Sequence, residues 1–394
     1  MRAAFNGEAG WIAGIFALLL LVACAAPAPP TAVPTKAPAA QPTQAAPAVA
    51  TKPAEKAAEK PAAKATATAP TKAAMPAPLS PAVKLRIGSL GISDDGPIFL
   101  GTERGYFKEL GLEVDWVPFD ASSKVIPALA AGQLEIAGAG TTVALFNSFA
   151  RGIGINAAAT SAKTGAGHQH ISLMIRKDLA DKVKDFKDLK GLKIGVVSNN
   201  GPAYPEMGKI LAKAGLSFND VNLVYMFWPD QMAAFANKAL DAGIVVEPFS
   251  TQAQEQGLAV NWKYAHPDFY PDHQTSVMLY APQFMERQPE AARRFLIAYI
   301  RGIRDYLDAF DKGVNKDEVI RIMTKYTNVK DVALYNKMKV PGFDRNGYIL
   351  TQHLKDDQDF FVSQGLINAS EKANIDKLVN YSYLEYALGI VGKE

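Results

Sequence analysis

The sequence predicts an α/β protein of two similar lobes, joined at a hinge and followed by a mainly helical C-terminal part. From residue 84 onward, short apolar runs alternate with stretches of helical periodicity. Such alternation is typical of a mostly parallel sheet with helices on both faces. The alternation occurs twice, and a strand-like run flanks each set, so we expect the chain to cross between the lobes twice.

The first lobe contains three expected strand–helix pairs. Pro97 suits the first turn of a helix, and Gly111 suits the position after its end. The expected strands are residues 85–87, 113–117 and 134–137, and the expected helices are 97–110, 122–131 and 141–151.

The second lobe repeats this plan, and a helical region follows it. We expect strands at 192–197, 222–226 and 243–246, with helices at 203–214, 231–240 and 250–256. Further strands are expected at 171–176 and 275–280, and C-terminal helices at 289–310, 316–325, 330–337 and 348–364. The predicted domains are residues 81–180 with 275–394 for lobe 1, and 181–274 for lobe 2.

The positive charge of the chain belongs to its N-terminal region. The 394 residues carry a formal charge of +3, of which residues 24–80 contribute +4 and residues 81–394 contribute −1. A nucleic-acid-binding fold needs a basic face. The nearly neutral body therefore argues against a nucleic-acid partner.

The first residues have the features of a bacterial lipoprotein signal peptide. The apolar run Trp11–Val22 has twelve residues, whereas a membrane-spanning helix needs about twenty. Leu21-Val22-Ala23-Cys24 resembles the lipobox, whose cysteine receives acyl chains such as palmitate. Residues 1–23 are therefore predicted to be removed and Cys24, the only cysteine, to be lipidated. The alternative is an uncleaved apolar anchor with an incidental cysteine.

Residues 24–80 are predicted to form a disordered tether. The segment consists mainly of Ala, Pro, Thr and Lys, and 13 of the 25 prolines lie at or before Pro81. With so few large apolar residues it cannot form a core. A flexible coil of this length reaches about 40 Å on average, so it would hold the folded body near the outer face of the membrane.

Four segments of the body resemble one family of proteins. Asp188–Val197 is similar to the "DLKGKKIAV" segment of ABC-importer solute-binding proteins, in particular the taurine, alkanesulfonate and thiamine-pyrimidine group. Gly105–Val114 resembles the group's "GYFK..GL.V", Leu240–Pro248 its "DA...EP", and Pro289–Tyr299 its "PE....F..AY". Gly132–Glu135 departs mildly from the group's "G..D".

The resemblance implies a two-lobed periplasmic-binding-protein fold of type II that closes on a ligand by hinge motion. It implies a lipid-anchored, extracytoplasmic protein that delivers a small molecule to an ABC permease, whose ATPase subunit lies on a separate chain. It implies neither catalysis nor a cofactor, and we expect no metal site.

Ligands of such folds bind at the carboxyl ends of strands, where helix N-termini also meet. The loops expected at this edge contain polar and aromatic side chains. The candidate ligand-binding residues in them are Asp94, Gly96, Thr141, Thr142, Asn200, Tyr204, Phe227, Trp228 and Glu247.

The candidate residues favour a neutral heteroaromatic ligand with amino, imide or hydroxyl donors. Asp94 and Asp95 would repel a sulfonate, although Asp94 could instead cap a helix. Tyr204, Phe227 and Trp228 could stack on a flat ring, although at least one is expected in the core. Among vitamins we favour riboflavin, because the resemblance is greatest to the vitamin-binding members. A thiamine pyrimidine precursor, taurine and an alkanesulfonate remain alternatives.

Enzyme and sensor functions are the rival classes. The resemblance includes fungal pyrimidine-precursor synthases, but these carry a cysteine-rich iron-binding motif that a chain with one cysteine lacks. His168 and His170 could form a metal pair on one face of a strand, but without a third ligand we expect them to be polar residues at the cleft edge. A receptor sensor module would require a fused membrane or signalling segment.

Replacing Cys24 with Ala should move the protein from the membrane fraction to the soluble fraction. Lipid is attached through the thiol, and each buried methylene of an acyl chain contributes about 0.8 kcal/mol to membrane binding. Fractionation followed by immunoblotting measures this, with Met75→Ala as a control that leaves the lipobox intact. Continued sedimentation of the Cys24→Ala protein with membranes would contradict lipidation and support the apolar anchor.

Overall fold

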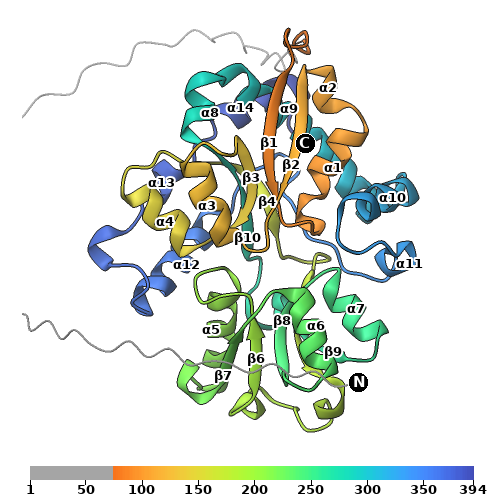
Figure 1. The fold of residues 1–394 in the computed structure, drawn as a ribbon, viewed down its shortest axis with the longest axis vertical. Helices are drawn as coiled ribbons and strands as arrows, with labels where there is room; N and C mark the ends of the chain where they lie inside the picture. The colour runs from red at the N-terminus through yellow and green to blue at the C-terminus, as the bar shows by residue number, and fades with distance from the viewer. Residues whose placement is uncertain (1–73) are drawn as a thin grey trace, which may run out of the picture. The chain divides into compact units, whose positions relative to one another are not determined.

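The computed structural model describes residues 74–394, which contain two five-stranded mixed sheets, each covered by helices (Figure 1). We call the sheets with their helices the first and second lobe. The predicted signal peptide, the lipidation site Cys24 and nearly all of the predicted tether lie outside the described residues.

The first sheet combines strands from distant parts of the sequence. β1 is parallel to β2 and β3, whereas β10 is antiparallel to both β3 and β4. In order across the sheet, the strands are β2 (Leu112–Pro118), β1 (Val83–Ser89), β3 (Ile136–Gly140), β10 (Gln274–Tyr280) and β4 (Asn156–Lys163).

The second sheet has the same arrangement. β6 is parallel to β7 and β8, and β5 is inserted antiparallel between β8 and β9. In order, the strands are β7 (Asn222–Tyr225), β6 (Lys193–Val196), β8 (Ala242–Val246), β5 (Ile171–Arg176) and β9 (Ala259–Tyr264).

The strand at 171–176 does not belong to the first sheet, where the sequence pattern placed it. β5 pairs with β8 from Ile171 to Ile175 and with β9 on its other side, so the chain crosses to the second sheet before residue 171 rather than near 180. A strand buried on both faces is apolar throughout, and this composition carries no information about which sheet it joins.

Within residues 74–394, fourteen α-helices surround the two sheets. The first lobe has α1 (Gly96–Glu103), α2 (Tyr106–Glu109), α3 (Ser122–Ala130) and α4 (Val143–Ala150). The second lobe has α5 (Ala203–Ala214), α6 (Trp228–Ala236) and α7 (Phe249–Glu255). The C-terminal part has α8 (Pro282–Arg287), α9 (Pro289–Lys312), α10 (Lys316–Tyr326), α11 (Val332–Tyr335), α12 (Thr351–Ser363), α13 (Ile375–Leu378) and α14 (Ser382–Val391).

The single helix expected over residues 97–110 is in fact two helices. α1 ends at Glu103, and α2 begins after Gly105, whose φ of 74° lies in the left-handed region. Glycine adopts this conformation at low cost, so Gly105 changes the direction of the chain between the two helices.

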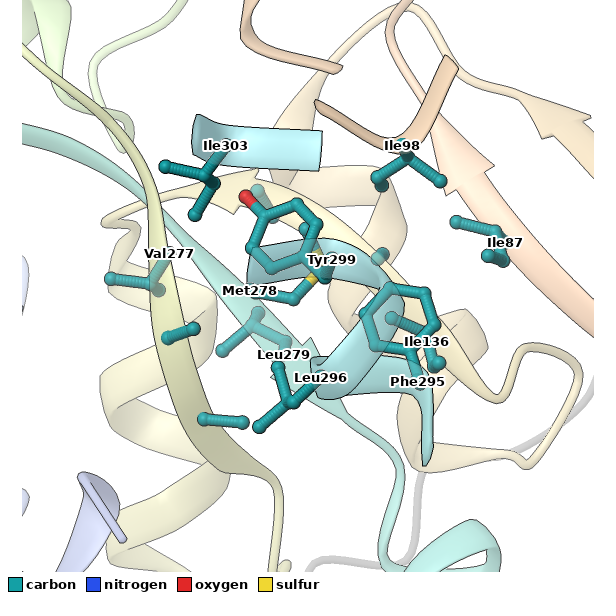
Figure 2. Packing of buried hydrophobic residues seen from close by; sticks show 14 of the residues in the cluster. Ile87, Ile98, Ile136, Val277, Met278, Leu279, Phe295, Leu296, Tyr299 and Ile303 are labelled. Atoms are coloured by element: carbon teal, nitrogen blue, oxygen red, sulfur yellow. The ribbon is translucent and has the colours of Figure 1, made fainter. Parts of the chain in front are cut away.

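The C-terminal helices complete the core of the first lobe. α9 has 24 residues, and its apolar side lies over the first sheet. Figure 2 shows Phe295, Leu296 and Tyr299 of α9 packed near Met278 and Leu279 of β10. Burial of one such side chain contributes about 1.5–3 kcal/mol, so this helix is a major source of stability for the first lobe. The second lobe has a separate core.

None of the helices in residues 74–394 combines the length and the apolar composition needed to cross a membrane.

Replacing Gly302 of α9 with Ala should destabilise the protein by about 1–3 kcal/mol, because a side chain there would overlap with the backbone carbonyl of Pro97 in α1. Chemical denaturation measures the loss. Gly389 of α14 is the matched control: it is also helical, a Cβ there would contact nothing within 4 Å, and alanine should stabilise by up to about 1 kcal/mol. Equal effects of the two substitutions would contradict this packing.

Candidate functional site

A small cavity of about 60 Å³ lies between the two lobes, at the carboxyl ends of β1, β3 and β8. Both lobes contribute to its wall, and no Lys or Arg is among the residues lining it. These residues are Leu90, Ile92, Asp94, Asp95, Ser122, Gly138, Ala139, Gly140, Thr275 and Ser276 from the first lobe, and His170, Ile171, Pro202, Ala203, Glu206, Trp228, Ile244 and Val246 from the second lobe.

An adjacent cavity of similar volume, about 60 Å³, shares part of this wall. The shared residues are Leu90, Ser122, Pro202, Ala203 and Trp228. The second cavity also reaches Thr142 and Asp120. We call the two cavities with their shared wall the interlobe space, and acidic side chains but no Lys or Arg line it.

The lobes contact each other directly around this space. The backbone N–H of Val143, in the first turn of α4, donates to the carbonyl of Asn200 in the second lobe at 3.0 Å. The Ser93 hydroxyl donates to the carbonyl of Glu247 at 3.4 Å. Lys337 forms an ion pair with Glu255 of α7. These contacts hold the lobes closed over the cavity.

Asp95 is a structural carboxylate of the cavity wall. Its Oδ2 accepts from the Ser89 hydroxyl at 2.7 Å and from the Gly91 N–H at 3.2 Å. Burial raises its pKa to about 6, against the effect of these donors. Because Oδ2 of Asp95 already accepts two hydrogen bonds from the protein, we infer that Asp95 holds the loop after β1 in place.

Asp94 has a different environment, because one of its oxygens is buried without a partner among the described residues. Oδ2 accepts from the Ser276 hydroxyl at 3.2 Å, while Oδ1 is buried and has no partner among the described residues. Burial and the neighbouring Asp95 carboxylate raise the pKa of Asp94 to about 7. A buried carboxyl oxygen without a hydrogen-bond partner lowers the stability of the folded protein by about 1–3 kcal/mol. A ligand that donates a hydrogen bond to Oδ1 would remove this loss.

His170 lies beside Asp94 in the cavity wall. Its Nε2 lies 3.9 Å from Asp94 Oδ1, and both ring nitrogens are buried without a hydrogen-bond partner in the described part of the chain. Burial, together with the charges of His168 and His273, lowers the pKa of His170 to about 3. The ring is therefore neutral, with one donor and one acceptor available to a ligand.

Glu206 of α5 is the third carboxylate of the wall and is almost completely buried. Its Oε1 is 3.0 Å from Nδ1 of His273. Burial raises the pKa of Glu206, and the hydrogen bond and charge of His273 oppose this. The cavity is thus bordered by acidic groups from both lobes.

Three of the predicted ligand-binding residues lie at the interlobe space. Asp94 lines the first cavity, Thr142 lines the adjacent one, and Trp228 lines both. Trp228 is held by its neighbour Phe227, with ring centroids 4.9 Å apart, and by Phe249 at 6.1 Å.

The remaining predicted residues have other environments in this structure. Tyr204 stacks on Phe218 at 4.3 Å, away from both cavities. Gly96 begins α1 beside Tyr306. Thr141 donates to Asp357 at 2.6 Å, and Asn200 contacts α4 through its carbonyl. Glu247 accepts from the Thr251 hydroxyl and backbone N–H at the start of α7.

The N-terminus of α4 is already bonded to protein groups. Val143 N–H is taken by Asn200, and Leu145 N–H donates to the Thr142 hydroxyl at 3.1 Å. Anions bind at helix N-termini through such free N–H groups. An anion that used either of these two N–H groups would have to displace its present contact.

The residues that the sequence pattern missed are Glu206, Ser276 and His273. Glu206 lies in the first turn of a correctly predicted helix, directly after a predicted cleft loop, and this position was the available signal. His170 was expected at the cleft edge, and it does line the cavity. Within residues 74–394, no cluster of three or more His, Cys, Asp and Glu side chains is arranged to hold a metal ion.

Comparison with known proteins gives a consistent family and fold. The profile of the family described as "NMT1/THI5 like" matches residues 93–310. A binding protein of Brucella abortus is 26% identical over 244 residues, which are 61% of this chain and 70% of that protein.

Two solved structures are similar in fold. The alkanesulfonate-binding protein SsuA from Xanthomonas axonopodis pv. citri, bound to MOPS, has a TM-score of 0.60 at 19% identity, covering 78% of this chain and 99% of that one. The periplasmic nitrate-binding protein NrtA from Synechocystis PCC 6803 has a TM-score of 0.66 at 15% identity, covering 80% and 90%. The chain therefore has the periplasmic-binding-protein fold.

Replacing Asp94 with Asn should stabilise the ligand-free protein at pH 8 and much less at pH 5. The raised pKa of Asp94 means that the folded protein retains a proton which the unfolded chain releases, so this carboxyl lowers stability as the pH rises from about 4 to 7. Asparagine does not ionise, and the expected gain at pH 8 is on the order of 1–3 kcal/mol.

Denaturant unfolding at the two pH values measures this difference. Asp181→Asn is the control, since that side chain is fully exposed and should show no pH-dependent gain. A gain for Asp94→Asn that is the same at pH 5 and pH 8 would contradict the buried, partly protonated carboxyl.

Proposed function

The chain belongs to the NMT1/THI5-like family, and from this premise we propose that it is the extracytoplasmic solute-binding component of an ABC importer. In this role the two lobes enclose a small ligand, and the closed form delivers it to the permease. The interlobe cavity supports binding as the function, because its unpartnered groups are hydrogen-bonding side chains.

The proposed ligand is a small molecule no larger than one substituted ring, with amino or other N–H donors, such as an aminopyrimidine. The observation that carries this proposal is that Asp94 Oδ1 and both ring nitrogens of His170, in an acidic wall, are buried without a partner among the described residues. Carboxylates accept strong, charge-assisted hydrogen bonds from amino groups and protonated rings. Trp228 adds an aromatic surface for a flat ring.

Cavity size argues against riboflavin, which the sequence pattern favoured. Each of the two cavities is about 60 Å³, less than the roughly 150 Å³ cavity that holds benzene, so even a single-ring ligand requires the lobes to separate somewhat. A tricyclic flavin would require the lobes to lie much further apart than they do here.

Taurine or an alkanesulfonate is the second candidate, because a similar fold is that of a protein described as alkanesulfonate-binding. Two features of this chain oppose it. The wall contains Asp94, Asp95 and Glu206 without Lys or Arg, and two of the N-terminal N–H groups of α4, those of Val143 and Leu145, are occupied. Like charges at short range in a buried site are strongly unfavourable.

Membrane attachment through a lipidated Cys24 is part of the same proposal. A tether of the predicted length would keep the binding protein close to its permease and raise its local concentration there.

A thermal-shift screen of the purified folded body tests the ligand class. 4-Amino-2-methylpyrimidine should raise the melting temperature, because a ligand at a hundred times its Kd adds about 2.7 kcal/mol to the free energy of unfolding. Riboflavin, taurine and ethanesulfonate should have little effect. Stabilisation by a sulfonate, with none by the aminopyrimidine, would contradict the proposed ligand class.

Substitution of a wall carboxylate should then reduce affinity selectively. Glu206→Gln should weaken aminopyrimidine binding at least tenfold by calorimetry, because a charged acceptor is lost. Asp181→Asn, far from the cavity lining, should leave the Kd unchanged. If the Glu206→Gln protein binds the aminopyrimidine as tightly as the unchanged protein does, the ligand does not contact Glu206.

A further inference from the structure

A chain of three buried ionisable side chains leads from the cavity wall into the C-terminal part of the protein. Glu206 Oε1 lies 3.0 Å from His273 Nδ1, and His273 Nε2 lies 3.1 Å from Asp357 Oδ2. The three residues are at most 1% exposed. Only Glu206 lines the cavity, so His273 and Asp357 lie behind it.

The three residues come from three separate parts of the fold. Glu206 is on α5 of the second lobe, His273 lies immediately before β10 on the crossing back to the first sheet, and Asp357 is on α12. The histidine is 67 residues from Glu206 and 84 residues from Asp357 in the sequence. The hydrogen-bonded chain therefore connects the second lobe to the C-terminal helices of the first.

The surroundings of His273 favour its charged form. Each ring nitrogen faces a carboxyl oxygen, and the imidazolium form donates to both of them. Burial lowers the pKa of His273, but the charges and hydrogen bonds of Asp357 and Glu206 outweigh it and raise the pKa to about 9. The other groups facing this ring are Tyr270, stacked at 3.8 Å, and His353, whose centroid is 6.3 Å away.

Asp357 is held in place by two further donors. The Thr141 hydroxyl donates to its Oδ2 at 2.6 Å, and the Tyr270 hydroxyl donates to its Oδ1 at 2.9 Å. Lys209 lies over the Tyr270 ring at 5.1 Å. The side chain that orients His273 is thus itself oriented by residues of the first lobe and of the crossing segment.

Packing beside this chain fixes α12 against α5. The Phe360 ring of α12 occupies the space that a side chain at Gly208 of α5 would fill. It also makes an edge contact with Tyr204, with centroids 5.7 Å apart. The distance between Asp357 and Glu206 is therefore set by helix packing rather than by flexible surface contacts.

We propose that His273 and Asp357 are positioning residues for ligand binding, which hold Glu206 as an oriented carboxylate in the cavity wall. This inference rests on the proposed binding function. By this proposal, α12 contributes to the affinity for an amino-bearing ligand, although none of its residues lines the cavity. In this arrangement the Glu206 carboxylate reaches its binding geometry only when α12 is docked.

A double-mutant cycle with 4-amino-2-methylpyrimidine tests the proposal. Asp357→Asn is nearly isosteric and removes the charge that fixes His273, so the Kd should rise at least tenfold. In the Glu206→Gln protein, Asp357→Asn should have almost no additional effect, because it acts through Glu206. Asp356→Asn, one residue away on α12 and bonded only to Gln352, is the matched control and should bind as the unchanged protein does.

Two results of the cycle would overturn the proposal. One is an unchanged Kd for Asp357→Asn, and the other is additive losses in Asp357→Asn and Glu206→Gln, which would indicate a general structural effect. If the aminopyrimidine does not bind the unchanged protein, the proposed ligand class fails, and the same cycle is run with taurine or riboflavin, whichever binds.

A measurement without ligand separates the positioning network from the proposed function. In protein labelled with ¹⁵N-histidine, His273 should titrate near pH 9 with both ring nitrogens protonated below it, and Glu206→Gln should lower that midpoint. His273→Gln identifies the resonance. A midpoint unaffected by Glu206→Gln would overturn the coupling, whatever ligand the protein binds.

Discussion

The insertion of one antiparallel strand into each sheet is the constraint on which the rest of the structure depends. β5 lies between β8 and β9, and β10 lies between β3 and β4. Each inserted strand directly follows a crossing between lobes, and the residue before each strand is a histidine, His170 before β5 and His273 before β10. Both crossings therefore deliver an imidazole to the region between the lobes, one neutral and one charged.

These two histidines divide the acidic groups of the cleft into two sets. His273 pairs with both Glu206 and Asp357, so each group of that set has a partner within the protein. Asp94 lies beside the uncharged His170, and among the described residues neither Asp94 Oδ1 nor the ring nitrogens of His170 have a partner. Buried polar groups are normally hydrogen-bonded, so the unsatisfied set is the part of the cleft that is incomplete without a ligand. The satisfied set gives that ligand a rigid wall.

Much of the fold was predictable from local sequence. α5 was predicted with the observed limits because its amphipathic pattern ends at Gly215, which adopts a left-handed conformation. The alternating strands and helices of each lobe were also predicted. β4 and β9 were missed, since the alanine-rich run Asn156–Lys163 has little strand character. β5 belongs to the second lobe because it pairs with β8 and β9. Local sequence does not specify such pairing.

The site was predictable only where loop position determined it. Asp94 and Trp228 follow strands at the carboxyl edge, and both line the cavity. Thr141 and Glu247 lie at the same edge, but their side chains turn toward Asp357 and Thr251. For Thr141 this direction depends on a partner 216 residues away. The Glu206–His273–Asp357 chain joins residues far apart in sequence, so it becomes visible only in the folded protein.

The most direct test of this account is the response of the His170 side chain to ligand. In ¹⁵N-histidine-labelled protein titrated with 4-amino-2-methylpyrimidine, the ring nitrogens of His170 should shift and saturate with the Kd measured by calorimetry. The ring should remain neutral, because its buried position keeps its pKa low. Saturable binding that leaves the His170 resonances unchanged would contradict the central claim that the ligand completes the hydrogen bonds of Asp94 and His170.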